Sequence, residues 1–293
     1  MQTLFHMVYL PLRVSLISLK YTELPPYLGS TLRGVTGQAL REIDREAYHF
    51  LYENGKKGGG EQDVGKPYVI VPPRACGVKT MVEQGEILDF DFLLFGRGIQ
   101  YAQALITAFG RIGEYGLGAQ RAPFGLLQIA HGEDGRMIWR EGQAYPAGLR
   151  PVELPCRRLP QAAGAVVRLV TPLRIRRKGQ LVTSIPFPTL IRNITTRTAA
   201  MTERYGGWTD QEEAARLQRL AEQIRMTREE LRLKRLERYS NRLGEKMDFS
   251  GLLGELAYEG DLTPFVPWLY AAQVLHVGRN TTFGMGRIQV YFF

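Results

Sequence analysis

Residues 276–287 form a glycine-rich segment whose composition suits contact with phosphate. The segment reads His-Val-Gly-Arg-Asn-Thr-Thr-Phe-Gly-Met-Gly-Arg, so three glycines stand among two arginines and three small polar residues. Glycine lets backbone amides approach an anion closely, and amides in such a turn can form an anion-binding concavity. The same glycines also suit a tight helix-to-strand turn that needs them only for their φ angles. The segment alone leaves both interpretations open.

An earlier part of the chain repeats this arrangement. Residues 97–112 have a helical pattern, residues 113–125 hold four glycines and Arg121, and residues 126–129 look like a strand. The later loop likewise lies between an amphipathic run, 262–275, and an apolar, β-branched run, 288–292. The two copies are much further apart than the units of a solenoid, so the pattern favours a duplicated domain.

The overall charge of the chain favours a polyanionic partner. Its 293 residues include 38 basic and 29 acidic side chains, a net charge of +9, which suits nucleic acid or an acidic membrane face. No apolar run approaches the roughly eighteen residues of a membrane span. Residues 1–19 lack the basic start and cleavage site of a signal peptide. We therefore expect a cytoplasmic protein with no membrane partner.

Metal and nucleotide sites are not predicted. Cys76 and Cys156 stand alone, and the carboxylates show no metal-ligand spacing, so neither zinc nor a disulfide framework is indicated. Residues 60–66 nearly spell a nucleotide-binding P-loop, but Pro67 replaces the required Ser or Thr. We expect no cofactor.

The elements that would hold the two loops fall into two similar halves. In the first half we expect strands at 7–19, 67–71, 86–95 and 126–129, with helices at 32–52 and 97–112. Ser30 or Thr31 can cap the first helix. The order β-α-β-β-α-β is the split ferredoxin-like pattern.

The second half repeats the pattern after a Gly- and Pro-rich stretch. We expect domains at 1–131 and 163–293, joined by a linker at 132–162 that has room for a hairpin. The second domain would contain strands at 165–175, 250–258 and 288–292, and helices at 187–205 and 262–275. A capping box at Thr209 and Glu212 predicts a helical insertion around 209–230, while residues 231–240 suit either a strand or a helix. The predicted fold is α+β, with two tandem ferredoxin-like (RRM-like) domains.

Four stretches give the chain a resemblance to a known family. They are Leu32-Arg33-Gly34, residues 95–98 with the loop at 113–118, residues 238–242 with Gly251, and residues 276–286. With the two ferredoxin-like halves, they resemble the CRISPR pre-crRNA-processing endoribonucleases of the RAMP (repeat-associated mysterious protein) superfamily. The resemblance covers nearly the whole chain, and residues 276–286 are its most specific part.

The resemblance implies a metal-independent RNA cleavage. In this reaction the 2′-hydroxyl of the RNA attacks the adjacent phosphate and leaves a 2′,3′-cyclic phosphate and a free 5′-hydroxyl. The family's catalytic histidine lies near the end of the first helix, where this chain has His49, and Tyr52 matches its position more closely. The other catalytic candidates are Lys56, Lys57 and His276. We expect His6 and His131 to be structural.

The resemblance also implies an RNA surface on the second glycine-rich loop and nearby basic faces. The predicted RNA-binding residues are Arg33, Arg174, Arg176, Arg177, Arg192, Arg197, Gly278, Arg279, Asn280, Thr281, Thr282, Gly284, Gly286 and Arg287. The expected partners are CRISPR repeat RNA, crRNA and other subunits of CRISPR effector complexes, with the chain itself a monomer or homodimer. Two alternatives stay open, a non-catalytic RNA-binding subunit of such a complex and a general single-strand RNA-binding module.

Overall fold

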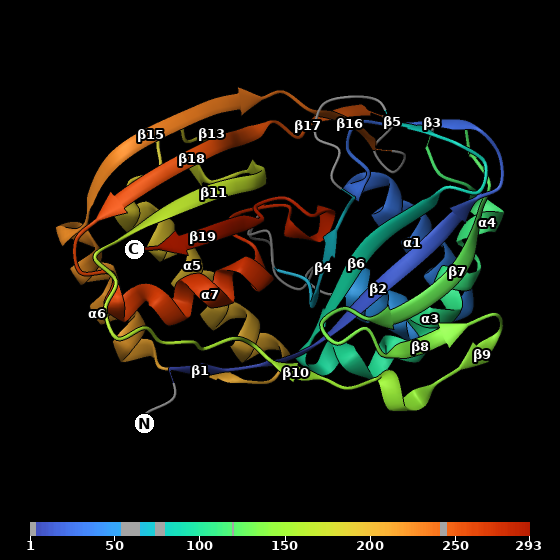
Figure 1. Cartoon of the computed structure of the whole chain (residues 1–293), viewed down its shortest axis with the longest axis horizontal. Coiled ribbons are helices and arrows are strands. Elements are labelled where there is room, and N and C mark those ends of the chain that lie inside the picture. The colour runs from blue at the N-terminus through green and yellow to red at the C-terminus, as the bar shows by residue number, and fades with distance from the viewer. Residues whose placement is uncertain (1–3, 54–64, 74–79, 119, 241–244) are drawn as a thin grey trace. The chain divides into compact units, whose positions relative to one another are not determined.

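The computed structural model describes residues 4–53, 65–73, 80–118, 120–240 and 245–293 (Figure 1). The chain divides into two compact units. Unit 1 contains Met1–Met7 and Leu154–Phe293, and unit 2 contains Val8–Glu153. No helix in the described ranges is long and apolar enough to cross a membrane.

Unit 2 has a ferredoxin-like core with an extended sheet. The sheet order is β4-β6-β2-β7-β8-β9, with β10 also paired to β2, and all pairs are antiparallel. Its first four strands have the order 2-3-1-4 of the ferredoxin-like fold. The strands are β2 (Val8–Ser18), β3 (Thr22–Leu24), β4 (Tyr68–Val71), β5 (Thr80–Val82), β6 (Ile87–Phe95), β7 (Phe124–His131), β8 (Met137–Arg140), β9 (Gln143–Ala144) and β10 (Val152–Glu153). The helices are α1 (Gly29–Ile43), α2 (Arg45–Tyr48), α3 (Ala102–Gly110) and α4 (Ile112–Tyr115), with a π-helical turn η1 (His49–Glu53) and 3-10 turns η2 (Gly96–Tyr101) and η3 (Pro146–Gly148).

Alternation along the strands places the core of unit 2 between its sheet and helices. Leu10, Leu12, Val14 and Leu16 of β2 are fully buried, whereas Arg13 between them is exposed. Leucine and valine at every second position lie on one face of the sheet, and α1 and α3 supply apolar residues that cover this face. The opposite face of this sheet carries ionic side chains, including the Arg13–Asp91 pair at 2.9 Å.

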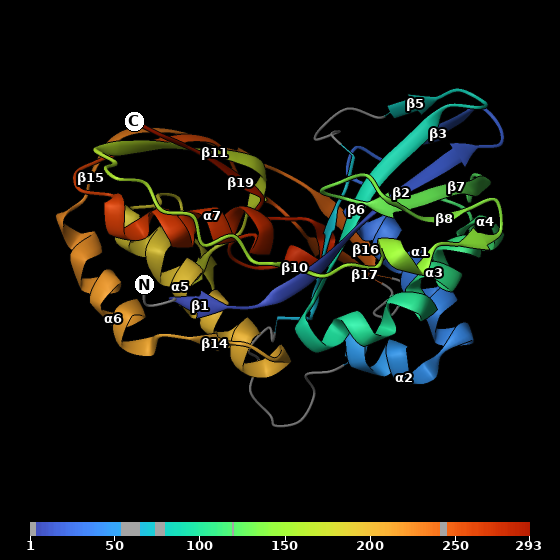
Figure 2. The ribbon, with the colours of Figure 1, turned by 60° about the horizontal axis from the view of Figure 1, so that its bottom comes forward.

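Unit 1 repeats the same topology. Its main sheet has the order β15-β18-β11-β19, again 2-3-1-4, and Figure 2 shows α5 and α7 together on one side of it. The strands are β1 (Phe5–His6), β11 (Gly164–Leu173), β12 (Arg176–Arg177), β13 (Gln180–Leu181), β14 (Trp208–Thr209), β15 (Arg225–Lys234), β16 (Glu237–Ser240), β17 (Glu245–Asp248), β18 (Gly251–Glu259) and β19 (Ile288–Phe292). The helices are α5 (Phe187–Tyr205), α6 (Gln211–Leu220) and α7 (Val266–Leu275), with 3-10 turns η4 (Ala221–Gln223), η5 (Thr263–Phe265) and η6 (Thr281–Phe283). The α+β class and the two ferredoxin-like halves are confirmed.

Several local predictions were wrong. The first helix is interrupted at Asp44, whose extended backbone and carboxylate, which accepts a bond from the Ala47 amide, start a new helix. Neither Ser30 nor Thr31 caps α1, because the helix already includes both. In the second half Asp210, rather than Thr209, caps the helix through the Glu213 amide at 2.9 Å.

Two longer segments also differ from expectation. The helix expected over residues 209–230 ends as α6 at Leu220, and residues 225–234 form the edge strand β15. Pairing with β18 over nine residue pairs overrides the helical propensity of its Arg-, Glu- and Leu-rich sequence. The expected hairpin after residue 131 is present as β8 and β9, and it extends the sheet of unit 2.

Candidate functional site

His49 is an accessible histidine on a distorted helical turn of unit 2. It starts the π-helical turn η1, a rare conformation that occurs often at functional sites. Its side chain is 75% exposed, and Nδ1 lies 3.4 Å from the Glu53 carboxylate. A carboxylate on one ring nitrogen fixes the tautomer and leaves the other nitrogen for a substrate. The geometry therefore suits a histidine that exchanges protons with a bound molecule.

Tyr52 lies three residues after His49 but belongs to the core. Its ring stacks on Tyr48 at 5.4 Å and packs against Tyr68 at 5.2 Å. The guanidinium carbon of Arg33 lies 5.1 Å from the Tyr52 ring centre, and Arg33 Nε donates to the Tyr68 hydroxyl at 2.9 Å. These contacts make one aromatic cluster around the Arg33 side chain.

The environment of Tyr52 disfavours proton transfer from its hydroxyl. Burial raises the pKa of Tyr52 well above its ordinary value, and Tyr68 adds to the rise, although the positive charge of Arg33 opposes it. Within the described part of the chain, no group meets this hydroxyl in hydrogen-bond geometry. A phenol with such a pKa stays protonated at neutral pH, so Tyr52 is poorly suited to act as a general base.

The glycine-rich loop of unit 1 is fixed to the end of β11. The Arg279 amide donates to the Arg174 carbonyl at 2.8 Å, and the Gly286 amide donates to the Pro172 carbonyl at 3.0 Å. The Arg287 amide donates to Thr171 Oγ1 at 2.9 Å. These three amides are already bonded to protein and therefore do not donate to a phosphate, while phosphate binding by the rest of the loop stays a prediction.

The loop glycines are required by the backbone. Gly278, Gly284 and Gly286 all have positive φ angles, between 73° and 83°. A Cβ atom on Gly286 would lie 1.8 Å from the Val277 carbonyl oxygen, and one on Gly278 would lie 2.4 Å from that of Arg174. The turn interpretation thus explains these glycines, while Asn280 also adopts the left-handed conformation, at φ 63°.

His276 lies inside the protein at the start of this loop. It is 1% exposed, and its Nδ1 lies 3.1 Å from the Met285 carbonyl, to which it can only donate. Burial and then the charges of Arg287 and Arg197 lower the pKa of His276 to about 3. The imidazole is therefore neutral near pH 7 and holds the two ends of the loop together. A catalytic role for His276 stays a prediction, and this burial argues against it.

The predicted RNA-binding arginines divide into buried and accessible groups. Arg174 is 3% exposed and donates to the Ser250 carbonyl and, at 3.3 Å, to the Asp248 carboxylate. Arg197 Nε donates to the Leu275 carbonyl at 2.9 Å, where a cation is favoured at the end of α7. Both side chains hold elements of the protein together. The exposed arginines are Arg176 and Arg177 on the β12–β13 hairpin, Arg192 on α5, and Arg279 on the loop.

The remaining predicted residues have simpler positions. Thr281 and Thr282 are buried within the loop, while Asn280 and Arg287 are partly exposed. Lys56 and Lys57 lie outside the described residues, as does Cys76. Sequence reasoning missed Glu53 as the partner of His49, although its spacing of four residues on a helix was a usable signal.

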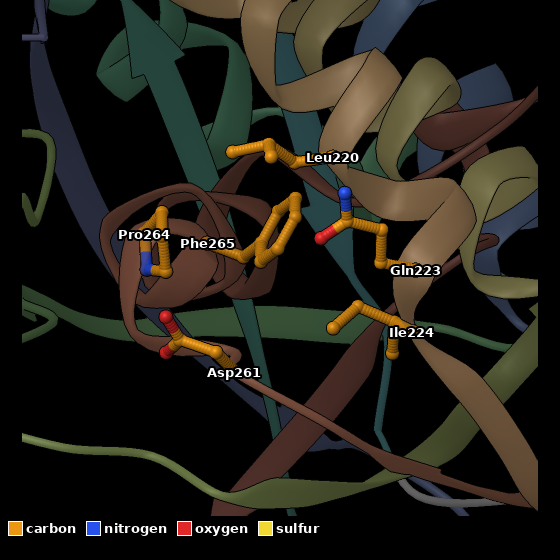
Figure 3. A pocket seen from close by; sticks show the side chains of 6 residues that line it. All are labelled: Leu220, Gln223, Ile224, Asp261, Pro264 and Phe265. Atoms are coloured by element: carbon orange, nitrogen blue, oxygen red, sulfur yellow. The ribbon is translucent and has the colours of Figure 1, made fainter.

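A cavity of about 160 Å³ lies at the other end of α7 from the loop (Figure 3). It is lined by Leu220, Gln223, Ile224, Asp261, Pro264 and Phe265. The Asp261 carboxylate accepts a bond from the Thr263 amide at 3.1 Å. Since its one charged lining residue is acidic, this cavity does not suit phosphate. In the described ranges no three His, Cys, Asp or Glu side chains gather as metal ligands.

Two family models match parts of the chain. Residues 7–151 match the family model AF_1859_N, an N-terminal domain, and residues 167–288 match the model of the CRISPR-associated endoribonuclease Cas6. A search of curated proteins found no match.

Solved structures share the fold over almost the whole chain. The product complex of Cas6 (TTHB231) has 19% identity and a TM-score of 0.61, covering 97% of this chain and 100% of its own. Thermus thermophilus Cas6 (TTHB231) has 17% identity and a TM-score of 0.58, covering 97% and 99%. A partial Cas6-RT-Cas1–Cas2 complex has 13% identity and a TM-score of 0.65, covering 98% of this chain and 46% of that one. Residues 167–288 therefore match the Cas6 endoribonuclease model, and the chain shares the fold of the solved Cas6 proteins over almost its whole length.

Proposed function

We propose that this chain cleaves CRISPR precursor RNA within its repeats, without a catalytic metal ion, to yield guide crRNAs. In the proposed step the RNA's 2′-oxygen loses a proton and bonds to phosphorus. The bond from phosphorus to the 5′-oxygen breaks, and that oxygen gains a proton. The products are a 2′,3′-cyclic phosphate and a 5′-hydroxyl. The match of residues 167–288 to the Cas6 endoribonuclease model supports the cleavage, and Cas6 proteins of the same fold have been solved with product or a substrate mimic.

The observation that carries the mechanism is the exposed His49 beside Glu53. One acid or base must accept the 2′ proton, or supply a proton to the 5′-oxygen, and histidine titrates in the right range for either task. Of the candidates His49, Tyr52 and His276, His49 alone is exposed. The proposal therefore assigns the chemistry of unit 2 to His49, and phosphate binding in unit 1 to the exposed Arg176, Arg177, Arg192 and Arg279.

The test is single-turnover cleavage of repeat RNA in excess EDTA. His49→Ala should slow cleavage by about 10²–10⁴, the usual contribution of an acid–base group. His6→Ala is the matched control, because His6 is a partly exposed histidine in β1 of unit 1. This variant should cleave RNA at the wild-type rate. Cleavage abolished by EDTA and restored by a divalent ion would contradict the metal-independent step. Equal rates for His49→Ala and wild type would contradict the assignment of His49.

A second candidate function is a non-catalytic RNA-binding subunit of a CRISPR complex. The burial of Tyr52 and His276 favours it, since that burial leaves a single exposed acid–base candidate among the three. A relative's structure in a Cas6-RT-Cas1–Cas2 complex is consistent with further CRISPR subunits as partners. Wild-type protein that binds repeat RNA tightly yet never cuts it would establish this second function and exclude the first.

A further inference from the structure

On the open face of the unit 1 sheet, in the part of the chain that the structure describes, the cations at one end are paired with carboxylates and those at the other end are not. This is the face opposite α5 and α7, and it displays Arg225 and Arg228 of β15. Arg225 pairs with Glu259 at 2.9 Å, and Arg228 pairs with Glu255 at 3.2 Å. Arg168 of β11 approaches Glu255 from the other side, at 3.8 Å. At this end of the sheet, each of these arginines therefore lies within ion-pair distance of a carboxylate, and Arg228 also lies 3.9 Å from Glu230.

The other end of β15 and the residue that follows it carry cations without such partners within the described ranges. Arg232, Lys234 and Arg235 form what we call the basic strand end. Arg232 and Arg235 are exposed and Lys234 is partly exposed. No carboxylate of the described residues lies within ion-pair distance of any of the three side chains. Arg232 and Lys234 share the open face with Arg228, because alternate residues of a strand point to the same side.

The basic strand end lies beside the glycine-rich loop. Lys234 pairs with Gly251 across the β15–β18 ladder. A Cβ atom on Gly251 would lie 3.0 Å from the Leu173 carbonyl and 3.1 Å from the Arg174 side chain. The backbone carbonyl of Arg174 in turn accepts a hydrogen bond from the Arg279 amide of the loop. Neighbouring strands are about 4.8 Å apart, so Lys234 is about two strand spacings from the backbone that anchors the loop.

We infer that the basic strand end extends the RNA-binding surface of unit 1, and that Arg232 and Lys234 contact phosphates of an RNA strand that also passes Arg279. This inference rests on the proposed function. The paired arginines at the far end carry little net attraction for an anion, because a carboxylate neutralises each one. The basic strand end can bind phosphate without first breaking an ion pair. In an extended strand, cations on the same side are about 6.6 Å apart, which suits contacts with successive phosphates of an RNA backbone.

The experiment compares two double variants with equal loss of charge. Arg232→Gln with Lys234→Gln removes the unpaired cations, and Arg225→Gln with Arg228→Gln removes two paired cations from the same strand. RNA affinity is measured against salt concentration for both variants and for wild type. Each lost phosphate contact on a single strand should reduce the slope of log K against log salt by about 0.7, so the first variant should lose about 1.4. The second variant should keep the wild-type slope.

Each outcome separates the inference from the proposed function. Wild-type slope in the first variant, or an equal loss in both, would overturn the inference while leaving RNA binding intact. Wild-type protein with no affinity for repeat RNA would overturn the proposed function itself. Far-UV circular dichroism and thermal unfolding of both variants establish that β15 remains folded. If the first double variant is unfolded, the single variants Arg232→Gln and Lys234→Gln replace it, and each should reduce the slope by about 0.7.

Discussion

His49 and Tyr52 are three residues apart, yet one is in solvent and the other is in the core. The difference arises in the π-helical turn, which follows the break at Asp44 and changes the direction of successive side chains. Sequence spacing placed both residues near the end of a helix but gave no information about burial. The contacts that bury Tyr52 come from Gly37 and Tyr68, which are distant in sequence.

Tyr52→Phe should leave the cleavage rate close to that of wild type. The lost hydroxyl is buried, and its raised pKa keeps it protonated. Single-turnover cleavage measures the rate, and a fall of about 10² would show that the hydroxyl does take part. Tyr52→Ala is the structural comparison, because removing the packed ring should lower the free energy of unfolding by about 3–5 kcal/mol.

His276 should make folding sensitive to acid. Its folded pKa is lowered to about 3 from an ordinary 6.5, so between these values the unfolded chain binds more protons than the folded one. Stability from this group is present above about pH 6.5 and is lost as the pH falls toward 3, by up to about tenfold in the unfolding equilibrium constant per pH unit.

The pH dependence is measured by denaturant unfolding between pH 4 and pH 7. His276→Asn is the comparison, because asparagine has an amide that can donate to the Met285 carbonyl and does not titrate. The wild type should lose stability more steeply than this variant on acidification. Parallel curves for the two proteins would show that His276 is not protected from protonation. Its burial could not be read from the sequence, because it depends on Met285, nine residues away across a turn.

Among the elements, the apolar and alternating strands were predictable and the charged one was not. β2, β6, β11 and β18 alternate or are continuously apolar, and α5 was predicted with its observed bounds. β15 is an edge strand with solvent on its open face, so its sequence has the charges of a surface helix. The pairing partner β18 is what selects the strand, and a local window of sequence does not contain it.

A single added methyl group at Gly286 should disrupt the folded conformation of the glycine-rich loop. Gly286→Ala places a Cβ atom against the Val277 carbonyl and forces alanine to a φ of 73°, so we expect a large loss of stability or of RNA affinity. Gly179→Ala is the matched control. Gly179 also has positive φ, at 80°, but open space around it, so only the strain of about 1–2 kcal/mol remains. Thermal unfolding should show the larger decrease for Gly286→Ala, and equal decreases would mean that the close contact is relieved by movement.

On the scale of the whole molecule, the chain passes from unit 1 to unit 2 and back. Residues 4–7 belong to unit 1, where β1 pairs with β14 and the Met7 carbonyl accepts the Leu154 amide at 2.7 Å. The Phe5 ring is 2% exposed and meets Trp268 edge-on at 5.0 Å. The sequence predicted a single strand from residue 7 to 19 and gave no sign of this return, since the partners of β1 lie about two hundred residues further on.

Phe5→Ala should destabilise unit 1 although it lies far from the loop and from His49. Removing a buried aromatic ring should lower the free energy of unfolding by about 3–5 kcal/mol. Leu19→Ala is the control, because Leu19 is 51% exposed in unit 2. Calorimetric unfolding should show a lower transition temperature for Phe5→Ala only. Similar transitions for both variants would show that β1 contributes little to unit 1.

The division of the chain also sets an order of events during synthesis. Unit 2 is continuous from residue 8 to 153, so it can fold on the ribosome as soon as that segment has emerged. Phe5 has been made by then, but its neighbour Trp268 has not. Strand β1 therefore has no partner strand while unit 2 folds, because β14 has not yet been made. Unit 1 can complete its packing only after Trp268 has been made, and the glycine-rich loop at residues 276–287 is translated later still. A nascent chain can therefore carry a folded His49 region before the proposed RNA-binding residues of unit 1 have folded.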